Sequence, residues 1–382
     1  MMHRFAPYFG IVAALAVGVL AVVLSNVVSV QLAPTANIRV ASSTLSVVPN
    51  FSLPLITLPE RESAASTSSV SGTQNIPTPK TSIPSLKKPT PSVPATPVAA
   101  PLPAPSNAEL DAAASLLRSA LVNIICVVPA VSGLHSISGS GVFIDPKGII
   151  LTNAHIAQYF LLTDRGATCT IRSGSPAVER YSAALVYISP AWIKANASVI
   201  TQNAPSGTGE YDFALLAATK STDRNPLPDS FPSIPLAIAP VTPKTPVAIA
   251  SYGAQFLDSS QIQSNLSPIV VFGSVKDIFT FATNTIDVLA LGGSVAAQEG
   301  SSGGGVASAS GTLVGSIMTS TVTGNTASRS LNALTASYIR GEYASETGEA
   351  IDFLLGQPTA TSLSAFAQKI PELEAIITAQ LP

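Results

Sequence analysis

The sequence predicts an all-β fold, a barrel or a sandwich, for most of the last two thirds of the chain. Short apolar runs follow one another from VNIICVV (122–128) to TLVGSIM (312–318), and turn signals such as Asp145-Pro146-Lys147-Gly148 separate them. The chain is also rich in turn formers, with 31 Pro and 25 Gly. Many short strands joined by frequent turns are typical of barrels and sandwiches.

Composition bounds the class of protein. A chain of 382 residues usually holds one or two domains, and 46% hydrophobic residues allow a sizeable core. Only 10% of the residues are charged and the net charge is −2, which gives no electrostatic reason to expect a nucleic-acid partner.

The N-terminus contains an apolar segment, FGIVAALAVGVLAVVLSNVVSV (9–30), that is long enough to cross a bilayer as a helix. Arg4 precedes it, so residues 1–8 are expected to form a cytoplasmic tail. We interpret residues 9–30 as a transmembrane signal anchor, since no clean A-x-A cleavage site follows. The alternative is a cleaved signal peptide and a secreted protein; both place the rest of the chain outside the cytoplasm.

Residues 31–106 are predicted to be a disordered Ser/Thr/Pro-rich linker, because residues 76–106 contain ten prolines and cannot pack a core. A folded domain is expected over 107–357. It begins with a helix after Ser106, whose Leu110, Leu116, Leu117 and Leu121 have helical spacing. A C-terminal helical tail is expected over 358–382, interrupted by Pro371.

The chain has two cysteines, Cys126 and Cys169. Outside the cytoplasm such a pair can form a structural disulfide, and two separate buried thiols are the alternative. Two cysteines without a Cys-x-x-Cys motif do not indicate a zinc site, and no metal or other cofactor is expected.

The chain has only three histidines, so a candidate catalytic base can be found by elimination. His3 precedes the apolar segment and His135 lies in a predicted loop, whereas His155 follows a strand-like run. Asp212 stands directly before another apolar strand, where a carboxylate is costly unless it has a partner. A serine nucleophile needs a base of this kind and a carboxylate to orient it, although Asp212 could also be a strand-edge residue that faces water.

The segment EGSSGGG (299–305) offers a serine in a glycine turn followed by a strand. Glycines allow backbone N–H groups to converge on one point, as in an oxyanion hole. A phosphate loop would need a Gly-Lys-Ser/Thr ending and a following helix, both of which are missing. A plain Gly/Ser linker is the remaining alternative.

Three segments together resemble the chymotrypsin-fold serine peptidases: TNAHI (152–156), YDFALL (211–216) and GSSGG (300–304), in the order His, Asp, Ser. The run SGSGVFIDPKGIILTNAHIA (138–157) is similar to the bacterial HtrA-type branch. The resemblance implies two six-stranded antiparallel β-barrels, with a short N-terminal helix and C-terminal helices.

The resemblance also implies roles for individual residues. Ser302 matches the nucleophile, His155 the general base and Asp212 the carboxylate that orients it. The N–H groups of Gly300 and Ser302 match the oxyanion hole. Together with the N-terminal apolar segment, the resemblance implies an exported, membrane-anchored serine endopeptidase for protein or peptide substrates, active in envelope protein quality control or regulated proteolysis. The alternative is a protease-fold module that binds peptides but cuts them slowly or not at all.

The sequence departs from the family at several positions. Ser301 stands where trypsin-type enzymes have an aspartate, and Gly305 replaces a proline, which is expected to loosen the turn. Only 80 residues follow Ser302, so no PDZ domain is expected. Apart from Glu299, the predicted pocket segments, 294–300 and 315–321, carry no acid that would favour a Lys or Arg side chain of the substrate, and they suggest small or medium apolar side chains. Glu299 is expected to be a solvated charge at the rim.

Overall fold

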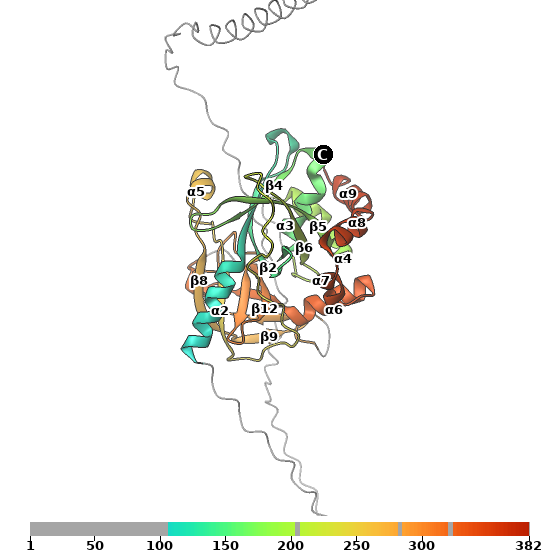
Figure 1. The fold of residues 1–382 in the computed structure, drawn as a ribbon. Helices are drawn as coiled ribbons and strands as arrows, with labels where there is room; N and C mark the ends of the chain where they lie inside the picture. Colours follow the sequence, from blue (N-terminus) through green and yellow to red (C-terminus); the bar gives the residue numbers. More distant parts are fainter. Residues whose placement is uncertain (1–105, 203–206, 282–284, 320–323, 382) are drawn as a thin grey trace, which may run out of the picture. The chain divides into compact units, whose positions relative to one another are not determined.

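The computed structural model describes residues 106–202, 207–281, 285–319 and 324–381 (Figure 1). The proposed cytoplasmic tail (1–8), the signal anchor or signal peptide (9–30) and nearly all of the linker (31–106) lie outside these residues. No helix within the described ranges is long and apolar enough to cross a membrane.

The first sheet is a closed six-stranded barrel, as predicted, with the strand order β1-β2-β3-β6-β5-β4. All its neighbouring strands are antiparallel. The strands are β1 (Leu121–Val127), β2 (Ile137–Asp145), β3 (Ile149–Thr152), β4 (Thr168–Ser173), β5 (Val178–Ile188) and β6 (Ala214–Ser221).

The barrel interior is filled by aliphatic side chains that converge from its strands and from the helix after β3. Gly139 and Gly141 on β2 provide the space: a Cβ at Gly139 would lie 2.7 Å from the Ile156 side chain, and one at Gly141 would lie 2.8 Å from that of Ile150. Both isoleucines are fully buried. The glycines of the SGSG run therefore serve barrel packing.

The second sheet has seven antiparallel strands, in the order β8-β7-β11-β12-β13-β10-β9. This differs from the predicted closed barrel of six strands. The strands are β7 (Pro246–Ser251), β8 (Ile269–Ser274), β9 (Asp277–Phe279), β10 (Val288–Ala290), β11 (Gly305–Ser308), β12 (Leu313–Thr319) and β13 (Leu331–Thr335).

A bend in one segment explains the difference. Only Val275 and Lys276 separate β8 from β9, yet the two strands lie at opposite ends of the sheet. The Val275 N–H donates to the Thr245 carbonyl beside β7, and the Lys276 N–H donates to the Ala290 carbonyl on β10. The bend therefore divides what would be a sixth strand into two, and its residues bridge both ends of the sheet.

Helices flank the two sheets. Figure 1 shows α2 on one flank of the described region and α6, α8 and α9 on the other. Helix α2 packs on β7 and β11, α8 on β5, and α6 on β12 and β13. The α-helices are α2 (Asn107–Ala120), α3 (Ala154–Ala157), α4 (Pro190–Asn196), α5 (Ser259–Ser264), α6 (Ala336–Thr347), α7 (Ile351–Gly356), α8 (Thr359–Ala367) and α9 (Ile370–Thr378). The 3₁₀ segments are Ala130–Ser132, Gln158–Arg165, Ala197–Thr201 and Thr326–Ser328.

Local sequence accounts for the ends of the helices. Ser106 and Glu109 form a reciprocal capping box at the start of α2, which satisfies amide groups that a helix leaves unpaired. The expected interruption at Pro371 is present: α8 ends at Ala367 and α9 begins at Ile370, with Pro371 in the first turn of α9, where its missing N–H costs nothing.

Cys126 and Cys169 form a disulfide. They are directly opposite each other on the paired strands β1 and β4, so the bond links two neighbouring strands of the first barrel. The sequence left two separate thiols as the alternative, because strand pairing is not visible in it.

Reduction of this disulfide is expected to destabilise the protein. The bond closes a loop over a sequence separation of 43 residues, and a loop of that size is worth about 2 to 4 kcal/mol through the unfolded state. Urea unfolding with and without reductant measures the loss. The double variant Cys126→Ala/Cys169→Ala is the control, and reductant should not affect it; an unchanged midpoint for the reduced wild type would contradict the prediction.

Candidate active site

Two neighbouring strands of the first barrel bring His155 and Asp212 together. His155 lies in α3, just after β3, and Asp212 lies two residues before β6. Strands β3 and β6 are paired, with Thr152 opposite Ala214. Residues just beyond these ends must therefore meet, although 57 positions separate them in the chain.

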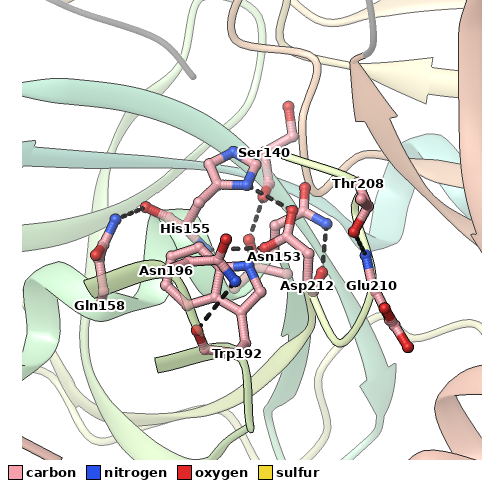
Figure 2. A network of polar contacts seen from close by, with 10 residues as sticks. Ser140, Asn153, His155, Gln158, Trp192, Asn196, Thr208, Glu210 and Asp212 are labelled. Carbon is pink, nitrogen blue, oxygen red and sulfur yellow. Dashed lines mark hydrogen bonds and ion pairs between the residues drawn. The ribbon is translucent and has the colours of Figure 1, made fainter. Parts of the chain in front are cut away.

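The two side chains form a buried pair (Figure 2). The Asp212 Oδ2 lies 2.7 Å from His155 Nδ1, and Oδ1 accepts a hydrogen bond of 2.9 Å from the His155 backbone N–H. The exposed fractions are 2% for His155 and 1% for Asp212. An ionised carboxylate only accepts hydrogen bonds, so it selects the neutral tautomer with the proton on Nδ1.

This tautomer leaves Nε2 of His155 as the basic atom. Nε2 is buried and has no hydrogen-bond partner among the described residues. The backbone around it is held from two sides: Gln158 Nε2 donates to the His155 carbonyl, and Asn153 Nδ2 donates to the Asp212 carbonyl (Figure 2). The imidazole is therefore fixed, with one basic nitrogen available.

Helix α6 supports the backbone next to Asp212. Tyr211 has a left-handed conformation, with φ of 59°, which is unfavourable for a residue with a side chain. Its N–H donates a 3.1 Å hydrogen bond to the hydroxyl of Tyr338, which is on α6. Sequence analysis missed Tyr338, because nothing local to it indicates a contact with a residue 127 positions away.

Ser302 lies in a turn in which four successive carbonyl groups, from Glu299 to Ser302, accept hydrogen bonds. Those of Glu299 and Ser301 accept from the N–H groups of Ala254 and Gly304. Those of Gly300 and Ser302 accept from the hydroxyl and the N–H of Ser140. In a trans peptide the N–H points away from the preceding carbonyl. The N–H groups of Gly300 and Ser302 are therefore fixed in direction, away from Ala254 and Gly304.

Gly303 must be a glycine. Its φ is 83°, and a Cβ there would lie 2.0 Å from the Ser140 carbonyl oxygen and 2.5 Å from Thr152 Oγ1. Thr152 lies three residues before His155, so this close approach brings the turn of Ser302 to the part of the first barrel that holds His155. Segments far apart in the chain thus meet at one place.

Ser301 and Gly305, the two positions where the sequence departs from the family, are both held by buried contacts. Ser301 is fully buried and its hydroxyl accepts a 3.1 Å hydrogen bond from Ser251. The expectation of a loose turn at Gly305 is wrong. Gly305 pairs with both Ala250 and Ser316, and a Cβ there would lie 2.5 Å from Leu117 of α2. The glycine makes room for this buried leucine, whose burial stabilises the fold by about 2 kcal/mol.

The segment before the turn carries the predicted small residues, and Ala296 and Ala297 are fully buried. Glu299 is half-buried, not solvated as expected, and burial raises the pKa of its carboxyl although the charge of Arg329 opposes that shift. Arg329 is buried and donates to the Ala297 carbonyl at 2.7 Å. The sequence reading missed this cation, since 32 residues separate the two.

His135 lies in a loop, where its carbonyl accepts from the Tyr159 hydroxyl. In the described part of the chain, no group of three or more His, Cys, Asp or Glu residues could hold a metal ion.

The chain was compared with protein families, curated proteins and solved structures. Residues 139–315 match the family model of the trypsin-like peptidase domain, and no curated protein matches the sequence.

Two solved structures resemble this chain only weakly. The inactive form of the Rv3671c protease is 18% identical with a TM-score of 0.38, covering 65% of this chain and 100% of its own. The active form of the Rv3671c protease, from M. tuberculosis, is 19% identical with a TM-score of 0.39, covering 69% of this chain and 95% of its own. The family match, and not these likenesses, carries the assignment. Residues 139–315 thus form a trypsin-like peptidase domain, and the chain is a serine-type peptidase.

Proposed function

We propose that this peptidase is an endopeptidase that cleaves protein or peptide substrates with Ser302 as nucleophile, His155 as general base and Asp212 as the carboxylate that orients it. The observation that carries the proposal is the buried pair of Asp212 and His155 Nδ1 at 2.7 Å, which leaves Nε2 as the acceptor. The close approach of Gly303 to Thr152 supports the role of Ser302, because it joins the serine turn to the segment that holds His155.

In the proposed mechanism, Ser302 Oγ attacks the substrate carbonyl while His155 Nε2 takes the hydroxyl proton. Asp212 stabilises the imidazolium that forms. The carbonyl oxygen becomes an oxyanion, which accepts hydrogen bonds from the Gly300 and Ser302 N–H groups. His155 then protonates the leaving amine as the C–N bond breaks, which leaves an acyl group on Ser302. Water, deprotonated by His155, hydrolyses this ester and restores the serine.

We also propose that the peptidase domain acts outside the cytoplasm, anchored by residues 9–30, on envelope proteins in quality control or regulated proteolysis. The charge-free segment after Arg4 and the proline-rich spacer support an anchor and a tether. The disulfide of Cys126 and Cys169 supports an oxidising compartment. The similarity of residues 138–157 to the HtrA-type branch supports the envelope role.

A peptide-binding module with little or no catalysis is the second candidate. One observation favours it: His155 Nε2 forms no hydrogen bond among the described residues, so the bond from Ser302 Oγ to this nitrogen that a primed triad has is not formed. Catalytic hydrogen bonds are often long without substrate, however, and tighten only when it binds. Activity measurements decide between the two candidates.

Replacement of the nucleophile is the direct test. Ser302→Ala is expected to lower kcat by a factor on the order of 10⁶ and to abolish labelling by a fluorophosphonate probe. Ser301→Ala is the matched control, since it removes the neighbouring hydroxyl but keeps Ser302 Oγ, and it should still be labelled. Wild-type protein that is folded but neither labelled nor active would support the binding module instead.

Replacement of the orienting carboxylate should act through the tautomer. In Asp212→Asn the amide can donate to Nδ1, which moves the imidazole proton to Nε2 and removes the base; kcat is expected to fall by about 10⁴. Asp145→Asn is the control, because Asp145 pairs with Lys147 in the hairpin between β2 and β3. Steady-state rates on one peptide substrate measure both, and equal effects of the two variants would contradict the assignment.

Loss of the Tyr338 hydroxyl should disturb Asp212 without removing any reacting group. In Tyr338→Phe the strained Tyr211 N–H loses its acceptor, so the Asp212 backbone can shift and kcat is expected to fall about tenfold. Tyr343→Phe, on the same helix, is the control. Rates measured at a temperature where all variants are folded test this, and a wild-type kcat for Tyr338→Phe would refute it.

A further inference from the structure

Ser140 on β2 contacts the nucleophile turn more extensively than any residue assigned so far. Its backbone N–H donates to the Ser302 carbonyl at 2.8 Å. Its hydroxyl donates to the Gly300 carbonyl at 2.8 Å and accepts from the Tyr252 N–H at 2.9 Å. Its own carbonyl accepts from Thr152 Oγ1 at 2.7 Å. The side chain is fully buried, so water cannot replace these partners.

The bond from the Ser140 hydroxyl fixes the peptide that follows Gly300, next to the peptide that carries the Gly300 N–H. Gly300 has φ of 88°. Glycine adopts positive and negative φ about equally readily, so its own backbone preference does not hold this conformation. Its carbonyl is fixed by the Ser140 hydroxyl, and the N–H on its other side belongs to the expected oxyanion hole. Without a donor for that carbonyl, rotation about the Gly300 backbone is less restrained, and the direction of its N–H is less well defined.

The same hydroxyl also fixes the neighbouring loop. The Tyr252 N–H donates to it, and the Ala254 N–H holds the Glu299 carbonyl at 2.7 Å. A Cβ at Gly300 would lie 2.7 Å from the Tyr252 carbonyl oxygen, so loop and turn are in direct contact. The Ser140 hydroxyl therefore joins two segments, the loop that contains Tyr252 and the turn that contains Gly300.

We infer that the Ser140 side chain is a positioning residue for the oxyanion hole: its hydroxyl fixes the carbonyl of Gly300 and, through the Tyr252 N–H, the loop whose Ala254 N–H holds the Glu299 carbonyl. Both contacts restrain the backbone around the Gly300 N–H, which is directed toward the developing oxyanion. The inference rests on the proposed endopeptidase function. It assigns Ser140 no contact with substrate. Because the oxyanion forms only as Ser302 attacks and is absent from the bound substrate, the loss of the hydroxyl should lower kcat and leave KM nearly unchanged.

The chain provides a matched control two residues away. Ser138 is on the same strand and the same face as Ser140, and it is also fully buried. Its hydroxyl accepts from Asn123 Nδ2 within the first barrel, and none of its described hydrogen bonds reaches the nucleophile turn. A purely structural role for buried serine hydroxyls on β2 would therefore make Ser138→Ala and Ser140→Ala behave alike.

The test compares wild type, Ser140→Ala and Ser138→Ala on one peptide substrate and on a peptide aldehyde of the same sequence, which forms a tetrahedral adduct with the nucleophile. Ser140→Ala is expected to lower kcat by about 10- to 100-fold, to weaken aldehyde binding by the same factor, and to leave KM and the pH dependence of kcat/KM unchanged. Ser138→Ala should keep wild-type kcat. Ser140→Cys, of nearly the same volume but with a weaker donor, gives the same comparison if Ser140→Ala does not fold.

The outcomes separate this inference from the proposed function. A wild-type protein that is folded but inactive contradicts the endopeptidase itself. An active wild type with unchanged kcat in the Ser140 variants overturns only the role of Ser140. Equal losses in Ser138→Ala and Ser140→Ala, or a change in KM without a change in kcat, also overturn it.

Discussion

The contact of the glycine turn with strand β2 is the constraint on which the proposed catalytic site depends. The second sheet contributes Ser302, the first barrel contributes His155 and Asp212, and the turn reaches the first barrel only because Gly303 has no side chain to separate it from the Ser140 carbonyl. A methyl group there would meet that oxygen at 2.0 Å. Any larger residue would push the turn away from Thr152, and with it the serine from the segment that holds the histidine.

The hydrogen bonds that connect both ends of each sheet fix the position of the contact between the turn and β2. In the first barrel every strand has two neighbours, so the ends of β3 and β6 are fixed relative to each other and bring His155 to Asp212. In the second sheet the bend at Val275 and Lys276 connects both ends through hydrogen bonds to Thr245 and Ala290. The strands that precede and follow the serine turn are thereby held in a rigid frame, as precise catalytic geometry requires.

The helices stabilise the site from outside the sheets. Helix α2 places Leu117 in the space left by Gly305, directly after the turn. Helix α6 supports the strained Tyr211 next to Asp212, and its Glu346 accepts hydrogen bonds from Tyr187, Ser189 and the Ala191 N–H of the first barrel. Strain of this kind persists only where the surroundings over-determine it, and it is concentrated at functional sites.

The sequence by itself determined the all-β class and the helix after Ser106, because short apolar runs, turn signals and helix caps are local properties. The scarcity of histidine, the glycine turn and the resemblance of three short motifs to a known family determined the set of candidate residues. The sequence also placed Ser301 and Ser302 in a turn before a strand. Only the tertiary structure decided the seven-stranded second sheet, the disulfide, the burial of Glu299 and the roles of Tyr338, Arg329 and Ser140. These depend on contacts between residues distant in the chain, such as Ser140 with Gly300, 160 positions apart, and packing of that kind leaves no local signal in the sequence.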